Sequence, residues 1–130
     1  MTNIELAFLA DAWIGYWQAS DGSPEREAHA WATDLYDLQY EAPETLWALI
    51  LQIHLRNKSI AIQQVLSAGP LEDLLAKHGE EFIDRVEAEA RKDPLFAKLL
   101  GGVWQNSMSD KVWIRLQSVW DRRGWDGIPE

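Results

Sequence analysis

The fold class is decided by residues 43–56, which read PETLWALILQIHLR. Apolar side chains occupy nearly every position from Leu46 to Ile53, so a helix here would be apolar on almost all of its surface. Such a helix is stable only when other elements surround it. Pro43 suits the first helical turn, because the N–H that proline lacks would have no helical acceptor there. The sequence therefore predicts a helix over 43–56 that is the most buried element of the protein.

Helical periodicity continues on both sides of this segment. No segment shows the alternating pattern of a β-strand. We predict an all-α fold, a compact multi-helix bundle of about eight helices with solenoid-like helical hairpins, in a single domain over 1–130. The expected helices are 3–19, 24–40, 43–56, 60–68, 70–78, 80–92, one from 94 and 110–123. After them we expect a tail from Gly124 to Glu130, whose Trp125 and Ile128 pack back on the domain.

Charge and composition exclude several classes of function. The 130 residues carry a net charge of −9, and residues 1–50 hold nine acidic side chains against the single basic Arg26. Nucleic-acid binding is not expected, since affinity for phosphates comes mainly from Lys and Arg. Cysteine is absent, which removes disulfides and thiolate metal sites. The N-terminus lacks the basic region of a signal peptide, and no apolar run could span a bilayer. We therefore expect a cytoplasmic protein that binds no membrane.

Carboxylates line two of the predicted helices. Asp34, Asp37 and Glu41 fall on one side of the helix over 24–40, and a second row of Glu80, Asp84 and Glu87 falls on the helix over 80–92. Two facing acidic helices could hold a divalent ion, with His78 nearby. No Glu-x-x-His motif accompanies either row, and none of the three histidines has a partner at ligand spacing. We predict no metal, no cofactor and no catalytic residue, with solvated faces as the ordinary explanation of both rows.

Tryptophan is the unusual feature of the composition, with eight in the chain. Helical spacing assigns four of them to the core, Trp13, Trp47, Trp104 and Trp113. The other four lie at helix ends or near charged faces, Trp17, Trp31, Trp120 and Trp125. Exposed tryptophan is a favoured anchor at protein interfaces. The alternative, that these four only rim the core, stays open at this point.

Two blocks of sequence carry a family resemblance. One is AGPLEDLL over 68–75, followed by His78-Gly79 and Phe82-Ile83, and the other is LGGVWQNSMSD over 100–110, followed by Val112-Trp113. Together they resemble an uncharacterised family of small bacterial proteins, catalogued as a domain of unknown function. The resemblance spans most of the chain and implies an α-helical bacterial protein, with no activity or cofactor attached.

The second block also holds two features that the residues alone make informative. Gly101-Gly102 either ends the helix that starts at 94 or lets another helix approach closely. Gln105 and Asn106 follow in a predicted turn beside Trp104. Capping of the turn accounts for such polar residues, and a contact with a ligand or a partner is the alternative.

Small size, acidity, many tryptophans and missing catalytic motifs favour a non-enzymatic acidic protein-binding module. We expect an inhibitor or modulator of the immunity or anti-defence type, whose protein partner has a basic surface. The alternatives are a small enzyme, metal-dependent or otherwise, that uses the helix-borne carboxylates, and a structural homo-oligomer or accessory subunit. The candidate partner-binding residues are Trp31, Asp34, Asp37, Glu41, Gln105, Asn106, Trp120 and Trp125.

Overall fold

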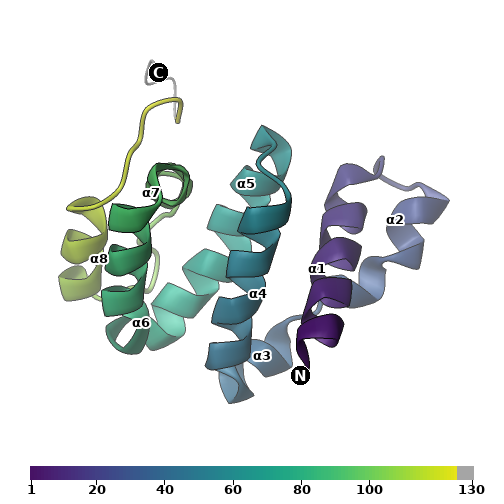
Figure 1. Cartoon of the computed structure of the whole chain (residues 1–130), viewed down its shortest axis with the longest axis horizontal. Coiled ribbons are helices and arrows are strands. Elements are labelled where there is room, and N and C mark those ends of the chain that lie inside the picture. The colour runs from purple at the N-terminus through teal and green to yellow at the C-terminus, as the bar shows by residue number, and fades with distance from the viewer. Residues whose placement is uncertain (126–130) are drawn as a thin grey trace. The chain divides into compact units, whose positions relative to one another are not determined.

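The computed structural model describes residues 1–125, and these are all-α, as predicted, with no strand among them. The chain forms two compact units, Met1–Leu66 and Ser67–Glu130. The α-helices are α1 (Asn3–Gln18), α2 (Pro24–Ala28), α3 (Tyr36–Glu41), α4 (Pro43–Arg56), α5 (Ile60–Leu66), α6 (Glu72–Lys92), α7 (Pro94–Leu100) and α8 (Asp110–Gln117). A 3₁₀-helix, η1 (Ala30–Thr33), and a π-helix, η2 (Ser67–Leu71), complete the set (Figure 1). That residues 1–130 form a single domain stays a prediction.

Helix α4 forms the centre of the first unit, as its apolar sequence predicts. Leu46, Leu49, Ile50 and Ile53 are completely buried. Helix α1 packs against α4 and contributes the buried Trp13. On the other side of α1, α2 and η1 run alongside it (Figure 1). No helix within residues 1–125 is long and apolar enough to cross a membrane.

The predicted helix over 24–40 is wrong, because the chain here forms three short pieces. α2 ends at Ala28, η1 follows as one 3₁₀ turn, and α3 begins only at Tyr36. The break comes from Asp34, whose backbone is extended and whose Oδ1 accepts a hydrogen bond from the N–H of Tyr36 at 3.2 Å. Short polar side chains compete in this way with helical hydrogen bonds. The acidic row of Asp34, Asp37 and Glu41 therefore does not lie along one helix.

Helix α6 organises the second unit and packs against α7 and α8. The sequence predicts breaks at Gly69-Pro70 and at His78-Gly79, and neither ends the helical path. Pro70 lies inside η2, and the π turn there tolerates the hydrogen bond that proline cannot donate. His78 marks a kink in α6, with φ of −133° and ψ of 25°. The predicted helices 70–78 and 80–92 are thus two halves of one kinked helix.

Helix α8 is shorter than the predicted 110–123. It ends at Gln117, and the Oγ of Ser118 donates to the carbonyl of Arg115. The chain then turns so that the N–H of Asp121 donates to the carbonyl of Ala97 on α7 at 2.9 Å. This bond to a neighbouring helix replaces a further turn of α8. Ile128, expected to pack on the domain, lies outside the described residues.

Candidate functional site

The first unit carries an exposed cluster of apolar side chains, which we name the aromatic patch and define as Ile4, Phe8 and Trp31. Their relative exposures are 83%, 66% and 54%. Ile4 and Phe8 are one turn apart on α1, so they are neighbours on its surface. The rings of Phe8 and Trp31 are stacked, with centroids 5.8 Å apart and planes at 21°. Two elements far apart in sequence thus combine into one apolar surface.

The fold of η1 holds Trp31 in this exposed position. Ala32, the next residue, is completely buried and fixes the 3₁₀ turn against α1. The Oγ1 of Thr33 donates to the carbonyl of Ala30 at 2.7 Å and closes the turn. Because the backbone is fixed on both sides of the indole, little conformational freedom remains to be lost when a partner covers it.

Asp34 follows η1 directly and is three residues after Trp31 in the chain. Its backbone is extended, so it lies outside the 3₁₀ turn. One carboxylate oxygen accepts from the N–H of Tyr36. Asp34 is exposed, and no basic side chain within residues 1–125 forms an ion pair with it.

Asp37 and Glu41 lie on α3, one helical turn apart, and both are exposed. Tyr36 and Tyr40 lie on the same helix, with ring centroids 4.5 Å apart and exposures of 62% and 53%. Helix α3 therefore presents aromatic and acidic side chains together, the same combination as Trp31 and Asp34.

All three basic side chains of the first unit already have contacts. Arg26 forms an ion pair with Asp21 at 3.2 Å and lies over the rings of Tyr16 and Trp17. Arg56 pairs with Asp11 at 3.1 Å. Lys58 donates to backbone carbonyls at the end of α4. The carboxylates of Asp34, Asp37 and Glu41 thus form no ion pair with a basic side chain in the described part of this unit.

In the second unit, the two sequence blocks meet at Glu72. Its Oε1 accepts from the backbone N–H of Trp104 at 3.2 Å and from the Nδ2 of Asn106 at 2.7 Å. Burial raises the pKa of Glu72, and the charge of Asp73 acts in the same direction, while both hydrogen bonds oppose the rise. Asn106 has a φ of 43°, a left-handed conformation that asparagine tolerates better than most residues. Asn106 therefore has a structural role in this turn.

The same turn displays Trp104 and orders Gln105. Trp104 is 61% exposed, so its predicted place in the core is wrong. α7 ends at Leu100, and the helical period that pointed Trp104 inward does not apply beyond it. The Nε2 of Gln105 donates to Asp110 at 2.7 Å and to the carbonyl of Met108. Gln105 thus closes the turn before α8.

An open pocket of about 380 Å³ lies at the kink of α6, beside the first turn of α8. Its polar lining includes Lys77, His78, Glu80, Glu81, Ser107 and Ser109. The Nδ1 of His78 lies 3.8 Å from Glu81, and the Oγ of Ser109 caps α8 by accepting from the N–H of Val112. The lining therefore mixes both signs of charge and selects no one class of ligand.

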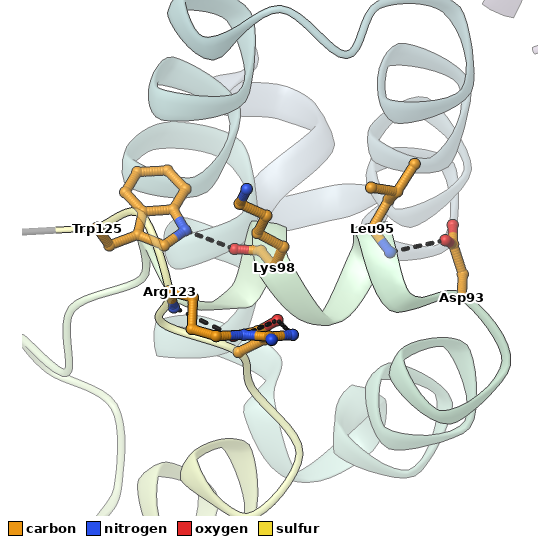
Figure 2. Close-up of polar contacts among 6 residues, drawn as sticks. Asp93, Leu95, Lys98, Arg123 and Trp125 are labelled. Carbon is orange, nitrogen blue, oxygen red and sulfur yellow. Dashed lines mark hydrogen bonds and ion pairs between the residues drawn. The ribbon is translucent and has the colours of Figure 1, made fainter. Parts of the chain in front are cut away.

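Trp125 and its neighbours pack against α7, as the sequence predicts for Trp125. Its indole N–H donates to the carbonyl of Lys98 at 2.7 Å (Figure 2). A Cβ at Gly101 would lie 2.5 Å from the carbonyl oxygen of Asp121 and 2.8 Å from the Trp125 ring. Gly101 and Gly102 thus do both things considered for them: α7 ends there, and another segment approaches closely, although that segment is not a helix.

Trp120 and the charged side chains near it have contacts within the second unit. Trp120 is half-buried, forms an edge contact with Trp113 at 5.2 Å, and has the guanidinium of Arg122 over its ring. Hydrogen bonds from Arg123 lower the pKa of Asp121 to about 2 (Figure 2). Trp125 thus has a hydrogen bond and Trp120 a cation–π contact, and Trp31 has neither kind of contact among the described residues.

Two of the three carboxylates in the acidic row of α6 are paired inside the second unit. Arg115 of α8 bonds Asp84 at 2.5 Å and Glu87, and the two carboxylates raise the pKa of Arg115 above its ordinary value. Glu80 lies at the rim of the pocket. Residues 1–125 contain no group of three or more His, Asp or Glu side chains placed to hold a metal ion.

Phe8 and Ile4 are the members of the patch that sequence reasoning missed. A signal was present, because both lie off the apolar stripe of α1 formed by Leu6, Leu9 and Trp13. An apolar residue on the side of a helix that faces away from its buried stripe has no core to enter unless another element covers it. The position of Phe8 on that side of α1 is the sequence signal for its exposure.

The chain is thus an all-α protein with an exposed aromatic and acidic surface on one unit and a polar pocket on the other. Residues 19–124 match the family described as "Family of unknown function (DUF6869)", and this match covers most of the sequence. The protein belongs to that family, which confirms the family resemblance of its sequence. No curated protein and no solved structure matches the chain.

Proposed function

We propose that this protein is a non-enzymatic protein-binding module that inhibits or modulates a protein partner in the bacterial cytoplasm, as immunity and anti-defence proteins do. The observation that carries the proposal is the stacked, exposed pair of Phe8 and Trp31. Scattered single apolar residues are ordinary on protein surfaces, whereas a contiguous cluster marks an interaction site. Here Ile4 extends the stacked pair along α1.

Energy and rigidity both support a protein partner. Tryptophan is enriched among the residues that contribute most to interfaces, where truncation to alanine costs on the order of 2 kcal/mol or more. Trp31 stands on a turn closed by Thr33 and held by the buried Ala32. Exposed side chains on the surface of α1 and η1 suit another protein better than a small molecule, since small ligands prefer concave sites.

The test places a photo-reactive residue inside the patch. Phe8→p-benzoylphenylalanine keeps an aromatic ring at position 8 and leaves Trp31 in place. The matched control carries the same group at the exposed Gln18, ten residues further along α1 and about 15 Å away. After irradiation in the source cells, we expect one protein adduct from position 8, and its loss when Trp31→Ala is added.

The size of the adduct distinguishes the alternatives. An adduct of this chain with itself would support the homo-oligomer instead, and a stable assembly of constant stoichiometry would support an accessory subunit. Equal yields of the same adducts from positions 8 and 18 would contradict the proposal, because they would show no preference for the patch.

A further inference from the structure

The chemistry around Trp31 indicates what kind of partner the patch binds, and this step rests on the proposed function. Phe8 covers one face of the indole, and 54% of the Trp31 surface stays exposed. The face of an indole attracts cations because its π-electrons are negative, and Trp is the best of the aromatic side chains for this contact.

Asp34, the residue that directly follows η1, adds a carboxylate three residues from Trp31 in the chain. Its carboxylate has one oxygen engaged with the N–H of Tyr36 and lies exposed to solvent. An indole face and a carboxylate from the same short segment match the two properties of a guanidinium, which is both a flat cation and a hydrogen-bond donor.

The rest of the unit strengthens this preference for positive charge. Residues 1–66 contain nine acidic and three basic side chains, a net charge of −6. Arg26, Arg56 and Lys58 are each held by internal contacts on other elements. No internal cation therefore occupies the place beside Trp31 within the described residues.

We infer that the partner presents a basic amphipathic segment, with an arginine or lysine against Trp31 and Asp34 and apolar side chains on Phe8 and Ile4. The apolar contacts supply most of the affinity, and the charges set the orientation and speed of association. A neutral or acidic partner surface would leave Asp34 facing an unfavourable neighbour.

The experiment uses two synthetic amphipathic peptides with the same leucine face. One carries arginines on its polar face and the other carries glutamates. Each is titrated into the full-length protein while the tryptophan indole N–H signals are followed by nuclear magnetic resonance. The Trp31 signal is assigned by its disappearance in Trp31→Phe.

We expect the arginine peptide to move the Trp31 signal and the glutamate peptide to leave it unchanged. Asp34→Asn should weaken binding about two- to fivefold, the size of an exposed charge interaction, while its amide oxygen keeps the bond to the N–H of Tyr36. Trp31→Ala should weaken binding roughly tenfold or more. Raising the ionic strength should weaken binding of the arginine peptide.

The matched control is Glu25→Gln, which removes one exposed charge from α2 in the same unit. Equal losses for Asp34→Asn and Glu25→Gln would overturn the inference, because they would show a general effect of net charge. Equal binding of both peptides would overturn it as well. If neither peptide moves the Trp31 signal, the basic partner is ruled out, and an adduct from position 8 would still uphold the proposed function.

Discussion

The two units of this protein treat their aromatic and charged side chains in opposite ways. The first unit exposes eight large apolar residues, among them Phe8, Trp31, Tyr36 and Tyr40, while the described part of the second exposes three. In the second unit, Arg115 binds two carboxylates, Arg123 binds Asp121, and the Trp125 indole has a backbone acceptor. The first unit therefore exposes more large apolar side chains, and the described part of the second unit pairs several of its charged and aromatic groups internally.

The difference separates residues that are buried in the fold from residues whose apolar surface is exposed. A buried group contributes to folding through its contacts, so its removal destabilises the protein. An exposed aromatic contributes little to folding, and its apolar surface is available for association. Mutations can test whether the eight tryptophans divide along this line.

The largest effect is expected for Trp13→Ala, compared with Trp31→Ala. Trp13 is 2% exposed and Trp31 is 54% exposed. Removing a buried aromatic side chain costs about 3–5 kcal/mol of unfolding free energy, because it leaves a cavity. Removing an exposed one should change it by less than about 0.5 kcal/mol. Urea denaturation followed by far-ultraviolet circular dichroism measures both variants, and a large loss for Trp31→Ala would mean that the patch is part of the folding core.

A smaller effect is expected where the second unit packs its C-terminal segment on α7. Gly101→Ala places a methyl group 2.5 Å from the backbone oxygen of Asp121, so this segment must move. We expect a loss of about 1–3 kcal/mol, the usual cost of overpacking. Gly69→Ala is the matched control, since nothing lies within 4 Å of a Cβ there. Similar losses in thermal or urea unfolding would show that Gly101 is not a packing site.

The fold class and the central helix could be predicted from the sequence because their signals are local. The apolar run over 43–56 and proline at the first turn of α4 and α7 depend only on neighbouring residues. The errors arose where a contact distant in sequence, or one side chain, overrode periodicity. Asp34 broke the helix predicted over 24–40, and the bond from Asp121 to Ala97 ended α8 early.

The candidate site could be predicted only in part, for a related reason. The sequence predicts Trp31 as a candidate because its acidic neighbours lie in the same short segment of the chain. Its partner Phe8 lies 23 residues away, and only the packing of η1 against α1 brings the two rings together. The prediction for Trp104 was wrong because it extends the helical period past Gly101, whereas α7 ends at Leu100.

The smallest effect concerns Glu72, the one carboxylate of the second unit that is buried against a turn without a basic partner among residues 1–125. Burial raises its pKa above the ordinary value of 4.5, so the folded protein holds this proton to higher pH than the unfolded chain does. The stability that comes from protonated Glu72 is therefore present below pH 4.5 and is lost as the pH rises through the folded-state pKa.

Glu72→Gln removes this titration and keeps an oxygen that can accept from Trp104 and Asn106. The unfolding free energy of the variant, minus that of the wild type, should therefore increase as the pH rises from about 4 toward neutral. Urea denaturation at a series of pH values measures this difference. A difference for Glu72→Gln that falls with rising pH would show that the hydrogen bonds to the ionised carboxylate outweigh its burial. Glu72 would then stabilise the turn that displays Trp104 through its charge.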